Sequence, residues 1–442
     1  MPVPHFALWR VGTMALALGG VSRGATVSEV TKPAGTPGDI RRELFVRSPK
    51  PGTAVFLSAS YYTARAGGDL ISMHGYLLRS DTIDAAFYRR STDNGRTWSD
   101  PVEVKTSEHR PDGTFRRVPL GGAVDSQTGR LVSFRIESLL PTDDPLEGMR
   151  RWYACYSVSE DGGRTWIVDE PVIQKGPEYS AVHPLPGVWI GKNCVMVAEL
   201  SAAPLTMADG TILMPVVITP LGPDGTYFNP GGGYTYFDVA VLRGRWRPDK
   251  HVEWELSARI QGDPARSTRG MDEASIAALA DGRLLIVMRG SNDKKPELPG
   301  RRWAAYSSDQ GKTWTEPTSW TYAGGEEFYS PATSSLLLQH SSGRLFWLGN
   351  ISPHNPTGNA PRYPFVIGEV DRRTGLLRKD TVRVVDDRAP QESEFLQLSN
   401  FAAREDRETG EIVLHMCRLF ERSTGAARDW TSDAYVYHIP IR

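Results

Sequence analysis

Short apolar runs alternate with turn-forming residues from Gly52 to the end of the chain. The runs have the length of β-strands, and Gly, Asp and Pro separate them. The spacing that marks an amphipathic helix is scarce. This pattern predicts an all-β protein. Residues up to about Arg42 show little strand pattern, so we expect the folded part to begin after them.

One eight-residue phrase, S-x-D-x-G-[RK]-T-W, occurs three times, each time directly after a strand-like run. Its residue types suit a tight hairpin turn. Asp accepts hydrogen bonds from N–H groups of its own turn, and Gly adopts the positive φ that such a turn needs. We expect the Trp to fold back as an apolar plug between neighbouring units. The three copies, which predict structural turns and not catalytic residues, are residues 91–98, 159–166 and 307–314.

The spacing of the copies predicts the number of structural units. Asp93 and Asp161 are 68 positions apart, whereas Asp161 and Asp309 are 148 apart. We therefore expect one unit without the phrase between the second and third copies, at residues 237–254, with Trp254 in place of the missing Trp. A second turn phrase, D-G-x-[LI] or D-x-x-T-G-x-L, recurs about once per unit. Together they predict about six blades, the last closed by strands from both chain ends.

The three octapeptides resemble the Asp-boxes, or BNR repeats, of the sialidase (neuraminidase) superfamily. That family folds as a six-bladed β-propeller, and its boxes lie at hairpins on the rim, away from the active site. The resemblance implies that this chain is an all-β, six-bladed β-propeller. We expect one such domain to span residues 46–442.

The N-terminal region resembles an export signal. Arg10 precedes an apolar run at residues 11–21, and small residues follow at 22–25. We expect a signal peptide at residues 1–25, a linker at 26–45 and a secreted or periplasmic protein. A disordered tail is the alternative. No other stretch is long and apolar enough to span a bilayer.

Charge and cysteine content exclude several classes of function. The chain has 51 basic and 52 acidic residues, so nothing suggests binding to nucleic acid or to an anionic membrane. Cys155, Cys194 and Cys417 lie far apart without metal-ligand spacing, and buried free thiols are the expected state. One disulfide is the open alternative. We expect no cofactor, no metal site and a monomer whose partner is a glycan or glycoconjugate substrate.

The resemblance also implies an active site at the funnel of the propeller. The family clamps a substrate carboxylate with three arginines, because a guanidinium fork binds both carboxylate oxygens at once. An Asp serves as acid/base, and a Tyr polarised by a Glu serves as nucleophile. A neutral hydroxyl suits that role because it avoids charge repulsion with an anionic sugar.

The best match to this pattern lies at residues 272–276 and 281–289. Glu273 stands at the start of one strand-like run and Arg289 at the end of the next, like the family's active-site Glu and one arginine of its clamp. The resemblance therefore assigns Glu273 to catalysis and Arg289 to substrate binding. The structural alternative is a surface carboxylate and a rim cation.

A second match, at residues 359–365, makes Arg362 the last arginine of the clamp. His354 and Asn359 lie in the same polar loop and could donate to sugar hydroxyls. The alternative for this segment is a Pro-braced turn with an exposed Arg.

A third match covers residues 73–84, just before the first box. It makes Arg79 another arginine of the clamp and either Asp81 or Asp84 the acid/base. His74 lies on the same strand and could serve as an acid/base instead. Asp81 could equally be a turn residue.

Two family features are missing from the sequence. The opening Arg-Ile-Pro is absent, and residues 58–60 (Ser-Ala-Ser) stand in its place. Leu398 occupies the position of the late Tyr, while Tyr329 and Tyr363 are substitutes that lie on other strands. An incomplete clamp binds a carboxylate less tightly, and a site without its Tyr cannot run the family's covalent mechanism.

Three functions follow from these observations. The first is a secreted, sialidase-like exo-glycoside hydrolase that releases a terminal acidic sugar, with sialic acid as the default. The second is a polysaccharide lyase acting on uronate chains, in which His74, His183 or Tyr329 would remove a proton α to the carboxylate. The third is a carbohydrate-binding propeller without catalytic activity.

Overall fold

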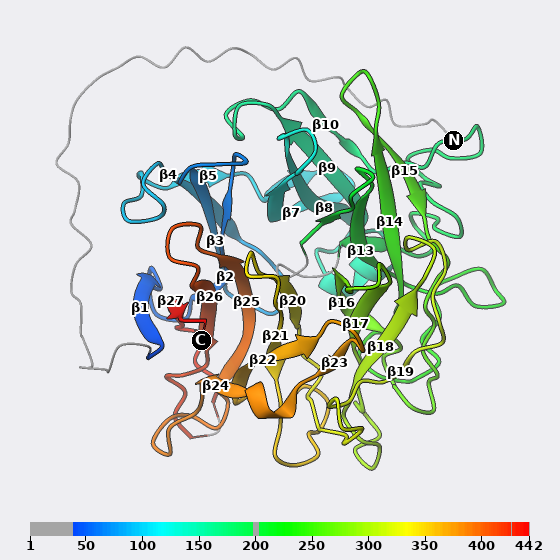
Figure 1. The fold of residues 1–442 in the computed structure, drawn as a ribbon. Coiled ribbons are helices and arrows are strands. Elements are labelled where there is room, and N and C mark those ends of the chain that lie inside the picture. The colour runs from blue at the N-terminus through cyan, green and yellow to red at the C-terminus, as the bar shows by residue number, and fades with distance from the viewer. Residues whose placement is uncertain (1–38, 198–202, 426, 442) are drawn as a thin grey trace. The chain divides into compact units, whose positions relative to one another are not determined.

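A computed structural model describes residues 39–197, 203–425 and 427–441. This part of the chain forms six antiparallel sheets and two short 3-10 helices, η1 Pro145–Arg150 and η2 Lys379–Thr381. The sheets are arranged around a common centre as the blades of a six-bladed β-propeller (Figure 1). The prediction of an all-β propeller is confirmed.

The first three blades follow one another along the chain. Blade 1 has the strand order β2-β3-β4-β5 (Ala54–Tyr62, Leu70–Leu77, Ala85–Ser91, Val102–Val104). Blade 2 has the order β6-β7-β8-β9-β10 (Ser107–Arg110, Gly113–Val124, Leu131–Leu140, Tyr153–Ser159, Val168–Pro171). Blade 3 has the order β11-β13-β14-β15, with β12 also paired to β13 (Val195–Val197, Leu205–Thr206, Ile212–Ile218, Asp238–Trp246, Val252–Leu256).

The last three blades complete the ring. Blade 4 has the order β16-β17-β18-β19 (Asp272–Ala278, Leu284–Arg289, Arg302–Ser307, Thr318–Ser319). Blade 5 has the order β20-β21-β22-β23, with β24 also paired to β22 (Leu336–Gln339, Leu345–Asn350, Phe365–Asp371, Leu376–Leu377, Arg383–Asp386). Blade 6 contains β25, β26 and β27 (Gln397–Glu405, Ile412–Leu419, Ala434–Ile439).

The N-terminal strand β1 (Arg41–Val46) is the outer strand of blade 6, where it pairs antiparallel with β27. Both chain ends therefore close one blade, as the turn count predicts. The propeller begins at Arg41, inside residues 26–45 that were expected as a linker, because these residues supply a strand edge to β27. The expected signal peptide at residues 1–25 and the linker up to residue 38 lie outside the described residues.

The three octapeptides are hairpin turns held by their own Ser and Asp. In the first, Ser91 Oγ donates to Asp93 Oδ1 (2.8 Å), and Gly95 N donates to Ser91 Oγ (2.8 Å). Thr97 donates to Asp93 through its N–H (2.9 Å) and its hydroxyl (2.6 Å), and these bonds with those from Ser91 lower the pKa of Asp93 to about 2. The same bonds recur in the other two copies.

The Trp of each box packs less uniformly than expected. Trp98 lies half-buried with its ring against Phe45 of β1 (centroids 5.8 Å apart), so it does plug the gap between blades 1 and 6. Trp314 is also half-buried against the core. Trp166, however, is 41% exposed, and for it the expected plug is wrong.

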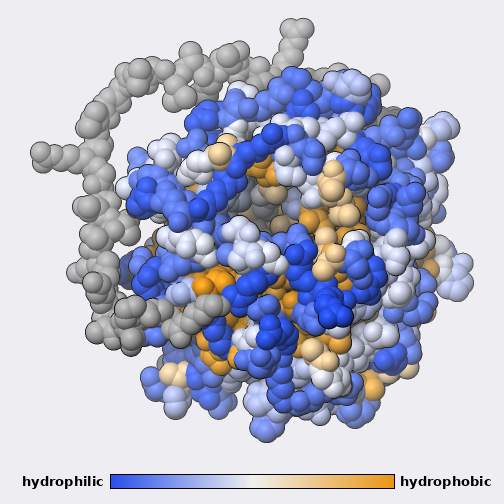
Figure 2. All heavy atoms as spheres, viewed as in Figure 1, coloured by the Kyte–Doolittle hydropathy of each residue, from blue (hydrophilic) through white to orange (hydrophobic). Residues whose placement is uncertain are grey.

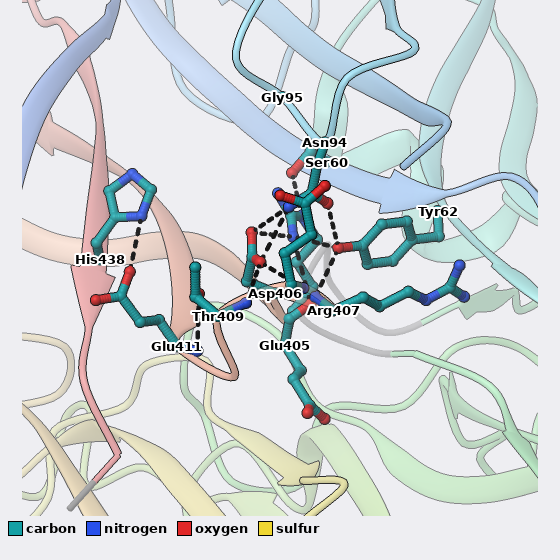
Figure 3. A network of polar contacts seen from close by, with 12 residues as sticks. Ser60, Tyr62, Asn94, Gly95, Glu405, Asp406, Arg407, Thr409, Glu411 and His438 are labelled. Carbon is teal, nitrogen blue, oxygen red and sulfur yellow. Dashed lines mark hydrogen bonds and ion pairs between the residues drawn. The ribbon is translucent and has the colours of Figure 1, made fainter. Parts of the chain in front are cut away.

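A polar network joins blades 6 and 1 where the ring closes (Figure 3). Asn94 of the first box donates from Nδ2 to both carboxylate oxygens of Asp406 (3.0 and 2.9 Å). Its Oδ1 accepts a hydrogen bond from the Tyr62 hydroxyl (2.7 Å), which in turn accepts one from Arg407 N (2.9 Å). The box therefore also bridges two blades that are far apart in sequence.

Blade 3 is the unit that lacks the octapeptide. Trp254 on β15 is buried, and its ring packs against Phe134 and Tyr156 of blade 2 (centroids 5.9 and 5.3 Å apart). Trp254 therefore packs between blades 3 and 2, as predicted for the residue that replaces the missing box Trp. The three cysteines are buried and free, as expected. No helix in the described part of the chain is long and apolar enough to cross a membrane.

Candidate active site

Two adjoining cavities open at the end of the propeller opposite the third box. In blade 4, Asp272 begins β16, Arg289 ends β17 and Arg302 begins β18, so these residues lie at one end of the sheet. Ser307, which opens the third box, ends β18 at the other end. The larger cavity has a volume of about 610 Å³ and the smaller one about 210 Å³.

Five residues line both cavities and so mark their junction: Phe56, Asp81, Tyr234, Arg269 and Glu273. The smaller cavity is otherwise lined mostly by apolar side chains, which come from strands, from η1 and from loops. In the space-filling view, hydrophilic residues dominate the outer surface, and hydrophobic residues come into view mainly toward the centre of the face (Figure 2). Two carboxyls, a phenol and a guanidinium thus meet beside an apolar chamber.

Glu273 and Arg289 form an ion pair in this wall, between Oε1 and Nη1. The register of β16 shifts between Asp272 and Ser275, and Glu273 has a positive φ of 31° within that irregularity. Ser334, just before β20, donates its hydroxyl hydrogen to Glu273 Oε2 (3.2 Å). The two charged side chains are 11% and 8% exposed, so their attraction is little screened by water.

A buried carboxylate lies behind this ion pair. Asp272 Oδ2 is 3.9 Å from Arg289 Nη1 and 3.6 Å from Arg269 Nη2, so it lies between the two guanidinium groups. Burial raises the pKa of Asp272, and the neighbouring Glu273 adds to the rise. Arg269 was not among the sequence-derived candidates, although it stands only four positions before Glu273.

A fully buried arginine supports the segment that carries Ser334. Arg302 donates from Nε to Ser330 Oγ (3.0 Å) and from Nη2 to Thr333 Oγ1 (2.6 Å). Burial lowers the pKa of Arg302 to about 9. Because Thr333 and Ser334 both line the larger cavity, Arg302 fixes part of its wall without reaching it.

Blades 5 and 6 also contribute residues to the wall of the larger cavity. Arg362 and Asn359 line it, with Arg362 donating to Asn359 O (3.0 Å) and to Ser399 Oγ (2.9 Å). Leu398 is buried in the core, and it is the next residue, Ser399, that lines the cavity. The expected absence of a Tyr at the start of β25 therefore holds in space as well as in sequence.

Asp81 and Tyr234 face the junction from blade 1 and from the loop before β14. Asp81 has a positive φ of 58° and accepts a hydrogen bond from Ser80 Oγ (2.9 Å). Partial burial, and then the negative charge of nearby Asp81, raise the pKa of Tyr234. Among the described residues, Tyr234 is the sole tyrosine that lines either cavity.

Two candidates near Asp81 do not line either cavity. Arg79 is exposed and pairs with Asp143 (Nη2 to Oδ2, 2.8 Å). Asp84 accepts a hydrogen bond from Leu78 N (2.9 Å) and so braces the turn between β3 and β4.

The remaining candidates also lie away from the cavities. His74 is buried in β3, stacked on Phe87 (5.3 Å between centroids), and burial lowers its pKa to about 4. His183 stacks on Trp189 (3.7 Å), and Arg301 lies over the ring of Tyr329 (4.8 Å). His354 is exposed, and none of these four lines either cavity.

Blade 1 presents an aromatic ring where the family pattern has an arginine. Ser58 and Ser60, from the Ser-Ala-Ser at that place, contact His415 of blade 6 (3.4 and 2.7 Å). Phe56, two residues earlier on β2, lines both cavities. The missing arginine is therefore not replaced from the same strand.

The larger cavity carries more positive than negative charge. Its acidic lining residues are Asp81, Glu273 and Asp293, and its basic ones are Arg269, Arg289, Lys294, Arg362 and Arg428. Such an excess attracts an anionic ligand. Within residues 39–197, 203–425 and 427–441, no group of three or more His, Cys, Asp or Glu side chains could hold a metal ion.

Comparison with known proteins agrees with this architecture. The family model described as a BNR repeat-like domain matches residues 147–399, more than half of the chain. No curated protein sequence matches. Among solved structures, a Dyadobacter fermentans protein of unknown function shares 15% identity over 92% of this chain and 100% of its own, with a TM-score of 0.57.

Two sialidase structures are similar at the level of the fold. The NanB sialidase of Streptococcus pneumoniae shares 13% identity over 92% of this chain and 71% of its own, with a TM-score of 0.56. The intramolecular trans-sialidase of Ruminococcus gnavus shares 14% identity over 90% and 97%, with a TM-score of 0.55. The chain therefore belongs to the BNR repeat-like family and has the six-bladed propeller fold of the sialidase superfamily.

Proposed function

We propose that the protein is a glycan-active enzyme, a sialidase-like exo-glycoside hydrolase that releases a terminal acidic sugar. The observation that carries the proposal is the junction of the two cavities, where two carboxyls, a phenol and a guanidinium meet in a wall with excess positive charge. Sialic acid is the default substrate because of the family resemblance. We extend the proposal to an exported protein on the basis of the signal-like residues 1–25.

In this proposal, the arginines of the larger cavity hold the acidic group of the sugar. Arg289 of blade 4 and Arg362 of blade 5 both line this cavity, and guanidinium groups bind carboxylates with two hydrogen bonds each. Asn359 and Ser399 beside Arg362 can bond to sugar hydroxyls. This arrangement would fix the sugar ring with its anomeric carbon near the junction.

The two carboxyls would then divide the chemistry. Asp81, which lies near Tyr234 at the junction, would give a proton to the leaving oxygen and later accept one from water. Glu273 forms an ion pair with Arg289, and its negative charge would stabilise the positive charge that develops at the anomeric carbon. The covalent route through a late Tyr is not part of the proposal, since Leu398 stands there.

The lack of that Tyr also favours a second candidate, a propeller that binds acidic glycans without cleaving them. The lyase reading loses support because His74, His183 and Tyr329 all lie outside the cavities. Among the described residues, Tyr234 is the one tyrosine in the cavity walls that would remain to remove a proton α to a carboxylate. A single screen separates the three functions.

The screen incubates the purified protein with an array of acidic glycans, including sialosides and uronides. A hydrolase produces a free acidic sugar and a new reducing end without ultraviolet absorbance. A lyase produces an unsaturated uronate that absorbs in the ultraviolet. Retention of a glycan without any product supports binding alone and overturns the proposed hydrolase.

A further inference from the structure

Arg269 is a cavity-lining arginine for which neither the sequence nor the family pattern provides a role. Its side chain is 13% exposed and lies at the junction of the two cavities. It enters from the loop before β16, so it belongs to blade 4, whereas the arginine missing from the family pattern would come from blade 1.

The guanidinium of Arg269 is held in place on one side only. Nε donates to Thr235 Oγ1 (3.1 Å), Nη2 donates to the same hydroxyl, and Nη2 also lies 3.6 Å from Asp272 Oδ2. Nη1 makes no hydrogen bond to any described residue. The planar group is therefore pre-organised, with donor capacity left at the cavity, and a pre-organised fork loses little entropy when an anion binds.

The charges around Arg269 also favour an anion. Burial lowers the pKa of Arg269, and the positive charge of nearby Arg289 lowers it further. Asp272 lies between the two guanidinium groups and Glu273 pairs with Arg289, so two carboxylates face two guanidinium groups here. The excess positive charge comes from the rest of the larger cavity, where Lys294, Arg362 and Arg428 outnumber Asp81 and Asp293, and it attracts an anion toward Arg269.

We propose that Arg269 is a substrate-binding residue that, together with Arg289, holds the acidic group of the sugar in place of the family arginine that blade 1 lacks. The face of Tyr234 lies 5.9 Å from the Arg269 guanidinium, on the loop that also supplies Thr235. Tyr234 and Thr235 therefore position the Arg269 guanidinium from the same loop. The inference rests on the proposed function only for the chemical class of the ligand.

The test measures binding of matched acid and ester probes by calorimetry. The probes are the methyl glycosides of N-acetylneuraminic acid and of glucuronic acid, each as the free acid and as the neutral methyl ester. We expect the wild type to prefer at least one acid over its ester by tenfold or more. Arg269→Met should abolish that preference, and Arg269→Lys, which keeps the charge but not the fork, should retain part of it.

Arg266→Met is the matched control, because Arg266 is an exposed arginine of the same loop that stacks on Trp303 and does not line the cavities. It should keep the wild-type preference. Thermal unfolding midpoints are measured first. If Arg269→Met does not fold, the test rests on Arg269→Lys. A preference of Arg269→Lys for the acid over the ester that equals that of the wild type would overturn the inference.

The outcomes separate this inference from the proposed function. Loss of the preference in Arg269→Met supports the inference even if no glycan is hydrolysed. If the wild type hydrolyses acidic glycans while Arg269→Met keeps the preference within twofold, the inference fails and the proposed function stands. A wild type that binds no acid more tightly than its ester also overturns the inference.

Discussion

At the scale of single residues, the two carboxyls of the junction have different surroundings. Glu273 forms an ion pair with Arg289 and accepts a hydrogen bond from the Ser334 hydroxyl, and these two partners come from different blades. Asp81 accepts a hydrogen bond from the Ser80 hydroxyl and forms no ion pair among the described residues. This difference in surroundings is why the proposed function gives charge stabilisation to Glu273 and proton transfer to Asp81.

The Ser334 hydroxyl bond can be tested without removing a charge. We expect Ser334→Ala to lower kcat/KM for the acidic glycoside about tenfold, because a hydrogen bond to a charged group is worth about 1.5 kcal/mol. The neighbouring Ser335→Ala is the control, since the buried Ser335 hydroxyl makes no hydrogen bond among the described residues and does not line the cavities. Equal rates in the two variants would contradict a role for Ser334.

His74 should act on stability and not on catalysis. Burial holds its pKa near 4, below the ordinary value of 6.5, so the unfolded chain binds more protons between these values. Stability from this residue is complete above about pH 6.5 and is lost as the pH falls toward 4.

We therefore expect the unfolding free energy of the wild type to fall by about 3 kcal/mol more than that of His74→Phe when the pH is lowered from 7.5 to 4. Urea unfolding at a series of pH values measures this difference. If both chains lose stability in parallel over that range, the protonation of His74 has no such effect.

At the scale of elements, the Asp-box is the unit whose structure follows most directly from local sequence. The Ser, Asp, Gly and Thr of each copy bond within the same turn, so three turns have one geometry. Asn94 and Gln310 occupy the same place in their boxes, with a φ of 61° in each. Only Asn94 also bridges blades through its side chain, in the network of Figure 3.

That difference between equivalent positions predicts unequal effects on stability. Asn94→Ala removes two hydrogen bonds to the Asp406 carboxylate and one from Tyr62, and should cost about 2–3 kcal/mol of unfolding free energy. Gln310→Ala is the matched control, because it carries the same backbone strain at an exposed side chain. Similar losses in both would mean that the strain, and not the bridge between blades, explains the cost.

At the scale of the whole molecule, the fold was predictable because each blade repeats a local pattern. The pairing of Glu273 with Arg289 was predictable for a similar reason: the start of one strand and the end of the next meet in an antiparallel hairpin. The places of Arg269 and Arg428 in the cavity wall were not, since these residues lie on loops whose paths depend on contacts between blades. Arg79 and Asp84 matched by position, but Asp143 and Leu78 hold them outside the cavity.

The proposed hydrolase activity requires that the junction cleave an acidic glycoside with the help of Glu273. The most direct measurement is the initial rate of acidic-sugar release from the best glycoside of the array, for the wild type and for Glu273→Gln. Glu327→Gln, an exposed carboxylate paired with Arg301, is the control. We predict a loss of at least about 1000-fold for Glu273→Gln with an unchanged unfolding midpoint, and wild-type activity for the control. Turnover by Glu273→Gln within about tenfold of the wild type would contradict a catalytic role for Glu273.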